Sequence, residues 1–168
     1  MRILGIDPGY AIIGYGVIDY EHSKMRLTAF GAVTTSADMP FERRLNAIYD
    51  DMCCLVQTYK PDEAAIEKLY FNTNQKTVID VAQARGVTLL PLIRAGLPIF
   101  EYTPLQVKSS IAGYGRAEKK QVQEMTKNLL HLAEIPKPDD AADAVALAIT
   151  HAYSVNTRSI MDKYKEQS

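Results

Sequence analysis

The sequence predicts an α/β fold in which a mixed β-sheet is covered by helices, and three observations support this prediction. The first 35 residues contain short apolar, β-branched runs separated by turns, which is typical of an antiparallel meander. Beyond them, helical stretches alternate with short apolar strands, as in proteins with parallel strand pairs. The 168 residues are 47% hydrophobic and 23% charged, close to the globular average.

Three strands are expected at the start. Residues 2–7 form an apolar run that ends in Asp-Pro-Gly, a strand followed by a turn. Residues 14–20 and 25–35 are rich in aromatic and β-branched side chains and indicate two more strands. The polar segment 21–24 suits a hairpin connection between them.

A helix and a fourth strand follow. Apolar side chains recur at spacings of 4, 3, 4, 3 and 4 from Phe41 to Tyr59, which places them on one helical stripe. Asp38 is a candidate N-cap ahead of Pro40, and Pro61 ends the helix. Residues 64–66 then form a short apolar strand that runs into Glu67.

The second half continues with helices and one strand. A helix is expected over residues 72–95, kinked or broken at Pro91, and a strand over 98–102. Thr103 and the proline after it predict a capped helix to residue 111. Further helices are expected over 117–132 and 139–153. We expect one domain over residues 1–155 and a polar, frayed tail over 156–168.

Composition excludes several classes of protein. No apolar run reaches the roughly 18 residues of a membrane span. The two cysteines, Cys53 and Cys54, are adjacent and build neither a disulfide framework nor a CxxC metal knuckle. With no signal-peptide pattern at the start, a reduced, cytoplasmic protein is expected.

Net charge is −1, but residues 60–130 hold ten basic and seven acidic side chains, an excess that suits a phosphate-facing surface or ordinary mixed charge.

Two acidic side chains end predicted strands. Asp7 closes the first strand and Glu67 closes the fourth. If these strands are parallel neighbours, both side chains lie at one edge of the sheet, where ligands bind in α/β proteins. Taken alone, Asp7 is equally explained by a turn role and Glu67 by an outward-facing edge position.

Two more acids begin the last helix. Asp140 and Asp143 are three residues apart and therefore share a face. Asp140 alone could act as a helix cap, but Asp143 precedes a nearly continuous apolar stretch and needs a partner. Four carboxylates without a His or Cys set match magnesium, with manganese as a substitute, and two such ions can promote phosphodiester hydrolysis.

Several side chains are candidates for contact with nucleic acid. Tyr70 and Phe71 follow Glu67 closely and could stack on unpaired bases, or one could pack into the core. Lys119 and Lys120 lie in a Gly- and Lys-containing segment that could bind phosphate, although solvated charges at a helix end explain it equally well. Glu101 also ends a strand, which edge exposure explains. The three histidines belong to no nucleophile motif and are expected at the surface or in the core.

Six short motifs, in order and in register over nearly the whole chain, resemble the RuvC family of crossover junction endodeoxyribonucleases. They are GIDPG at 5–9, AIE at 65–67, QARGV at 83–87, FEY-TP-QVK at 100–108, AEK-QV at 117–122 and DAADA-ALAITH at 140–151.

The resemblance implies a ribonuclease H-like fold, with a five-stranded mixed sheet whose first three strands are antiparallel. It implies a magnesium-dependent homodimer that resolves four-way (Holliday) junctions in recombination and repair by symmetric nicks, leaving 5′-phosphate and 3′-hydroxyl ends. A branch-migration motor complex of RuvA and RuvB subunits is the implied partner. The family's catalytic, metal-binding tetrad falls on Asp7, Glu67, Asp140 and Asp143.

The resemblance also places the family's stacking aromatic on Tyr70 and its DNA-contacting lysines on Lys108 and Lys119. The long helix after Glu67 is the implied dimer contact. Three alternatives remain: a ribonuclease H-like nuclease for RNA–DNA hybrids, an ATP-binding domain suggested by GIDPG, and a non-catalytic junction-binding scaffold.

Overall fold

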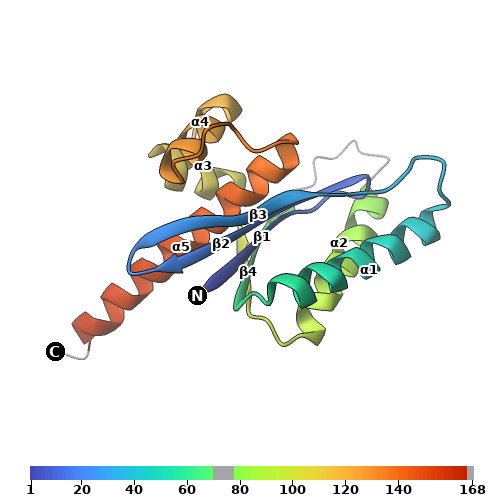
Figure 1. The fold of residues 1–168 in the computed structure, drawn as a ribbon, viewed down its shortest axis with the longest axis horizontal. Coiled ribbons are helices and arrows are strands. Elements are labelled where there is room, and N and C mark those ends of the chain that lie inside the picture. The colour runs from blue at the N-terminus through green and yellow to red at the C-terminus, as the bar shows by residue number, and fades with distance from the viewer. Residues whose placement is uncertain (70–77, 166–168) are drawn as a thin grey trace.

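The computed structural model describes residues 1–69 and 78–165, with side chains to residue 157 (Figure 1). Five strands form one sheet in the order β3-β2-β1-β4-β5. The strands are β1 (Arg2–Asp7), β2 (Ile12–Glu21), β3 (Lys24–Thr34), β4 (Glu63–Glu67) and β5 (Ile99–Tyr102). The predicted five-stranded mixed sheet is therefore confirmed.

The strand pairing sets which strand ends meet. β1, β2 and β3 are an antiparallel meander, as predicted, and Asp7 pairs with Gly14 of β2. β1 and β4 are parallel through the Ile6–Ile66 pair, and β4 and β5 are parallel as well. The carboxyl ends of β1, β4 and β5 consequently lie at one edge of the sheet.

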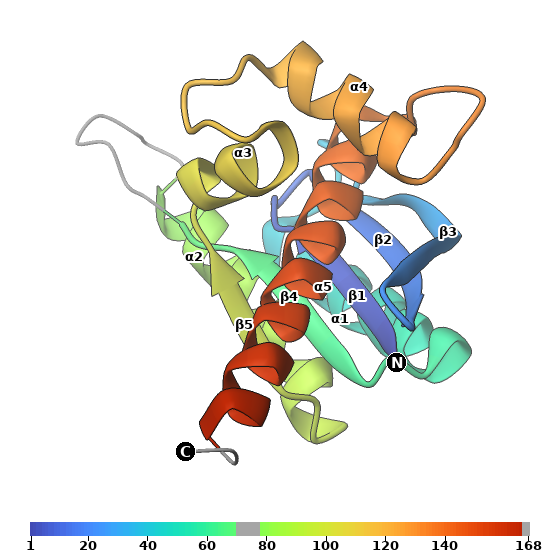
Figure 2. The ribbon, with the colours of Figure 1, turned by 90° about the vertical axis from the view of Figure 1, so that its left-hand side faces the viewer.

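Helices cover both faces of the sheet (Figures 1 and 2). One layer holds α1 (Phe41–Tyr59) and α2 (Val78–Arg94), and the other holds α3 (Pro104–Ala112), α4 (Lys119–Leu129) and α5 (Asp139–Lys165). A hydrophobic core fills each interface: aliphatic side chains under α1 and α2, and an alanine-rich face of α5 on the other side. None of the helices in the described part of the chain is long and apolar enough to cross a bilayer.

The predicted start of α1 and the predicted effect of Pro91 on α2 differ from the structure. Pro40, not Asp38, is the N-cap of α1, and it makes no side-chain cap. Its carbonyl accepts the first helical N–H groups, and Asp38 lies too far upstream to replace it. α2 continues through Pro91 to Arg94 instead of breaking. Pro91 is buried one turn before the helix ends, and its carbonyl accepts from Ala95 at 3.1 Å, so packing offsets the missing N–H.

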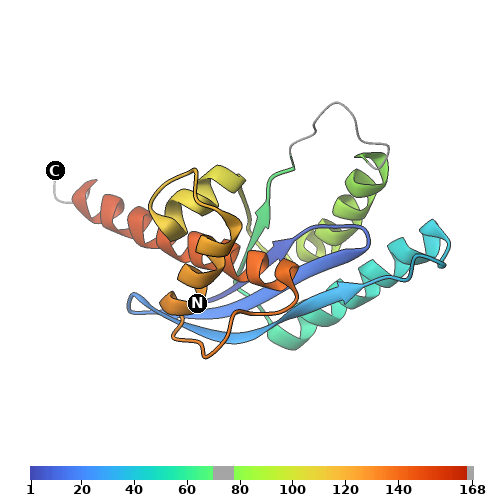
Figure 3. The ribbon, with the colours of Figure 1, turned by 90° about the horizontal axis from the view of Figure 1, so that it is seen from above.

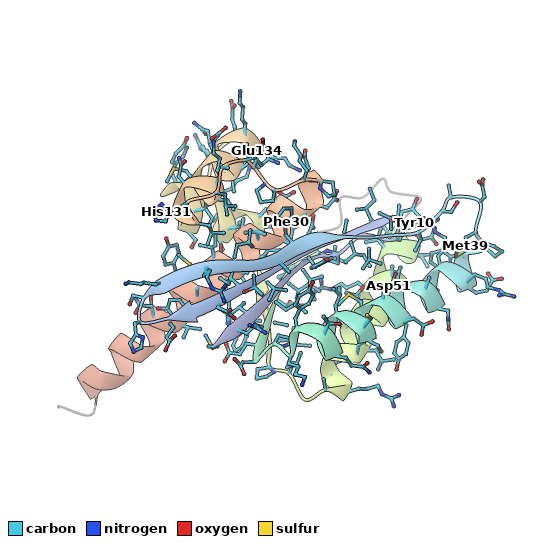
Figure 4. All side chains as sticks on the ribbon, in the orientation of Figure 1. Tyr10, Phe30, Met39, Asp51, His131 and Glu134 are labelled. Atoms are coloured by element: carbon cyan, nitrogen blue, oxygen red, sulfur yellow. The ribbon has the colours of Figure 1, made fainter. Side chains whose placement is uncertain are left out.

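Of the remaining helices, α3 begins as predicted, and α4 and α5 end at other residues than expected. α3 has a reciprocal capping box between Thr103 and Gln106. α4 ends at Leu129, and His131 has a φ of +52° in the turn that follows, on the α3–α4 side of the sheet (Figure 4). α5 extends to Lys165, so most of the expected tail at 156–168 is helical, because no Gly or Pro follows Pro138 to stop it. Its last turns project beyond the sheet (Figure 3).

Candidate active site

Asp7 and Glu67 lie side by side at the carboxyl edge of the sheet. Each follows directly on the Ile6–Ile66 pair that closes the parallel ladder between β1 and β4. Both side chains are half-buried. The prediction that these two acids share one sheet edge is confirmed.

The first turn of α5 brings the other two acids to this edge. A Cβ built on Gly14, the β2 partner of Asp7, would lie 1.9 Å from the main-chain oxygen of Asp140. One built on Gly5 would lie 2.0 Å from the oxygen of Ala144. The helix backbone therefore packs directly on glycines of the sheet, and Asp140 and Asp143 start beside Asp7.

The carboxylates are close enough to perturb one another. Burial, and then the charge of Glu67 and its hydrogen bond, raise the pKa of Asp7 to about 8, with smaller contributions from Asp143 and Asp140. Burial also raises the pKa of Glu67 and of Asp143, although Lys119 opposes both shifts. A half-buried cluster of carboxylates of this kind is relieved either by keeping a proton or by a nearby cation.

Lys119 supplies part of that compensation. It is the first residue of α4, and its Nζ lies 2.8 Å from Oδ2 of Asp143 and 3.8 Å from Oδ2 of Asp139. The hydrogen bond to Asp143 raises the pKa of Lys119. The amino group is therefore held over the acidic site, where a bound cation would compete with it for Asp143.

A cavity of about 250 Å³ opens beside the acids, between α3, α4 and α5. Four charged side chains line it: Glu67, Lys108, Lys119 and Asp143. The remaining lining is apolar, from Pro104, Val107, Val122, Ala146 and Leu147.

The predicted DNA-contacting lysines therefore separate into two groups. Lys108 and Lys119 face the acids, whereas Lys120 is exposed and does not line the cavity. Tyr70 and Phe71 lie outside the described residues.

The donor set suits a hard divalent cation, since it consists of carboxylate oxygens. Among the residues that the structure describes, no three His, Cys, Asp or Glu side chains are arranged as a metal site. The carboxylate of Asp143 is turned toward Lys119. The carboxylates fit a hard divalent cation by their chemistry, and binding one would require side chains to move together, with Asp143 exchanging its ammonium partner for the metal.

Arg85 is a residue of this region that the sequence analysis left without a role. It lies on α2, and its Nη1 donates to the main-chain oxygen of Glu67 at 2.7 Å. Its Nη2 forms an ion pair with Glu101, so the exposed strand-end acid has a partner. The only sequence sign of Arg85 was its place in the QARGV motif, because its contact with Glu67 spans 18 residues.

His151 lies in the core rather than at the surface. It is fully buried on α5, and its Nδ1 lies 2.7 Å from the hydroxyl of Tyr102. Its Nε2 is hydrogen-bonded to Glu63, and Phe100 packs against the ring with 4.5 Å between ring centroids. The histidine thus joins α5 to β4 and β5, and it lies away from the acidic cluster.

A β3-β2-β1-β4-β5 mixed sheet with acidic residues gathered at its carboxyl edge defines a ribonuclease H-like protein with a nuclease-type site. A family model described as crossover junction endodeoxyribonuclease RuvC matches residues 3–151. This chain belongs to that family of hydrolytic nucleases.

Individual relatives agree with this assignment. A crossover junction endodeoxyribonuclease RuvC of Brevibacillus brevis is 57% identical over 152 residues, 90% of this chain and 92% of that protein. The solved structure of Thermus thermophilus RuvC is 34% identical, with a TM-score of 0.86 over 94% of this chain and 96% of that one. A second structure, 32% identical with a TM-score of 0.85, covers the same shares and is of T. thermophilus RuvC in complex with Holliday junction substrate.

Proposed function

We propose that this chain resolves four-way DNA junctions in recombination and repair, as a magnesium-dependent endonuclease that makes paired, symmetric nicks and leaves 5′-phosphate and 3′-hydroxyl ends. The observation that carries the proposal is the meeting of Asp7 and Glu67 at one sheet edge under the acidic first turn of α5. Family membership and the relative in complex with a Holliday junction support the choice of substrate.

The four acids Asp7, Glu67, Asp140 and Asp143 would hold two divalent ions, with manganese able to replace magnesium. When bound, such ions lower the pKa of the attacking water and stabilise the leaving 3′ oxygen. Asp7 is the central ligand in this proposal, because the other three carboxylates all act on its pKa. Asp143 would bind an ion directly or through water, once Lys119 has released it.

The basic side chains would handle the DNA backbone. Lys108 and Lys119 stand on the wall of the cavity beside the acids and would contact phosphates near the cut, while the exposed Lys120 would act further out. Tyr70 and Phe71 follow Glu67 in the sequence and would stack on bases unpaired at the junction. This arrangement would keep positive charge beside an otherwise repulsive acidic site.

A homodimer accounts for paired cuts, because one two-fold axis would match the symmetry of the junction. Large apolar side chains project from α2, with Ile79 69%, Leu90 44% and Ile93 60% exposed. Such a stripe supports α2 as the dimer contact. The enzyme would act in the cytoplasm, together with a branch-migration motor of RuvA and RuvB subunits.

The test is cleavage of a mobile four-way junction in magnesium, by wild type, Asp7→Asn and Asp51→Asn. Asp51 is exposed on α1, on the other face of the sheet, and is the matched control (Figure 4). Symmetric nicks from wild type and Asp51→Asn, with none from Asp7→Asn, are expected. Junction binding by Asp7→Asn should persist or tighten, because negative charge near phosphate is removed.

Other outcomes separate the alternatives. Binding without metal-dependent cleavage by wild type would support a scaffold. Preferential cleavage of an RNA–DNA hybrid duplex would support the ribonuclease alternative. Loss of binding together with cleavage in Asp7→Asn would argue against Asp7 as a metal ligand.

A further inference from the structure

The main chain at Glu67 is held partly by the sheet and partly from outside it. The ladder between β1 and β4 ends at the Ile6–Ile66 pair, whereas Glu67 still pairs with Tyr102 of β5. The Glu67 carbonyl accepts a hydrogen bond from Nη1 of Arg85 at 2.7 Å. A side chain of α2 therefore adds to the hold on the end of β4, where its pairing with β1 has stopped.

Arg85 is itself firmly anchored. Its neighbours in α2, Ala84 and Thr88, are fully buried, and its own side chain is only 12% exposed. The second arm of the guanidinium is paired with Glu101 of β5. Because the guanidinium is planar and rigid, two fixed partners define its orientation, which a flexible lysine cannot reproduce fully.

Glu101 balances the charge of Arg85, so the guanidinium acts on the end of β4 chiefly through its hydrogen-bond geometry.

We propose that Arg85 is a positioning residue that fixes the end of β4 and thereby places the Glu67 carboxylate for metal binding. The inference deepens the proposed function and rests on it. Since α2 is the proposed dimer helix, the Arg85 hydrogen bond also connects the helix of the subunit contact to Glu67 of the acidic site.

The test compares Arg85→Met, Arg85→Lys, Glu101→Gln and Arg43→Met. Arg43 is an exposed arginine on α1, away from the proposed dimer helix, and is the matched control. Glu101→Gln removes the ion pair and leaves the donor to the Glu67 carbonyl in place. Three quantities are measured: Mn²⁺ binding to DNA-free protein by electron paramagnetic resonance, the magnesium dependence of junction cleavage, and the dimer fraction by light scattering.

Arg85→Met should weaken Mn²⁺ binding and shift the magnesium midpoint of cleavage by ~10–100-fold, the range for residues that orient metal ligands. Junction binding should stay within about twofold, because Arg85 is not among the residues that line the cavity with Lys108 and Lys119. Arg85→Lys should recover part of the loss, Glu101→Gln should lose less than Arg85→Met, and Arg43→Met should match wild type.

Unchanged Mn²⁺ affinity in Arg85→Met would overturn the inference, even if thermal stability or the dimer fraction fell. If Arg85→Met does not fold by circular dichroism, Arg85→Lys decides the question by the same Mn²⁺ titration. A wild type that bound Mn²⁺ but cut no junction would overturn the proposed function and leave the Arg85 measurement valid.

Discussion

Gly14 and Asp140 are in backbone contact: a Cβ at Gly14 would lie 1.9 Å from the carbonyl oxygen of Asp140. Any residue larger than glycine at position 14 would collide with the main chain of the first turn of α5. The contact sets how closely Asp140 and Asp143 approach Asp7, which pairs with Gly14 across the sheet. A residue without a side chain thus determines the spacing of the acidic cluster.

Replacing Gly14 with alanine should push the first turn of α5 off the sheet. We expect a loss of stability of about 1–3 kcal/mol, typical of overpacking, and a ~100-fold loss of junction cleavage from misplaced acids. Urea unfolding and a cleavage time course measure the two effects. Gly86→Ala, inside α2, is the comparison: a Cβ there meets nothing within 4 Å, so this variant should lose no stability and gain up to about 1 kcal/mol from helix propensity. Gly14→Ala with wild-type cleavage would show that the site tolerates the displacement.

The raised pKa of Asp7 predicts how the stability of the metal-free protein depends on pH. The folded protein keeps a proton on Asp7 up to about pH 8, whereas the unfolded chain loses it near the ordinary value of 3.8. The folded state therefore binds more protons in this range, and stability falls as pH rises, by at most ~1.4 kcal/mol per pH unit for one group.

Unfolding in EDTA from pH 5 to pH 8.5 measures this slope. Asp7→Asn should flatten it and be more stable than wild type at pH 8, leaving a residual slope from Glu67 and Asp143, whose pKa values are also raised. Magnesium binds the ionised carboxylates, so it should stabilise wild type more at pH 8 than at pH 6. A stability that rose with pH in EDTA would contradict the raised pKa of Asp7.

Lys119→Met should strengthen Mn²⁺ binding to DNA-free protein while weakening junction binding. The Lys119 ammonium is 2.8 Å from Oδ2 of Asp143 and competes with a metal for that carboxylate. Because the pair is partly exposed, we expect a change on the order of 1 kcal/mol, about fivefold in Mn²⁺ affinity. Lys120→Met is the control for the metal effect alone: Lys120 lies outside the cavity, so Mn²⁺ affinity should match wild type even where junction binding weakens. Weaker Mn²⁺ binding in Lys119→Met would mean that the lysine helps to hold the site.

His151→Phe should destabilise the protein without changing the metal site. The substitution removes the hydrogen bonds to Tyr102 and Glu63 from a fully buried position. We expect a loss of about 2–4 kcal/mol in urea unfolding, because the buried Tyr102 hydroxyl and the partly buried Glu63 carboxylate each lose a hydrogen bond. Mn²⁺ affinity at 20 °C should stay within about twofold of wild type. A large loss of Mn²⁺ affinity in a folded variant would place His151 in the site rather than in the core.

The sequence by itself determined the order of the elements and the two acids at strand ends. Periodicity, turn residues and caps act over a few neighbouring residues, so the meander, the capped α3 and the acidic start of α5 were all predictable. The same local rules gave the wrong result at Pro91 and after Val155. At Pro91 burial offset a local penalty, and after Val155 polarity was not enough to stop a helix that no residue terminates.

Only the tertiary structure decided how the site is assembled. Parallel pairing of β1 with β4 places Asp7 beside Glu67. Gly5 and Gly14 let the backbone of α5 approach the sheet closely, which brings Asp140 and Asp143 to the same edge. The Lys119–Asp143 ion pair spans 24 residues, and the Arg85 hydrogen bond to the Glu67 carbonyl spans 18. Such contacts depend on how whole elements pack against one another, and no local pattern of residue types encodes the distance between two side chains in different elements.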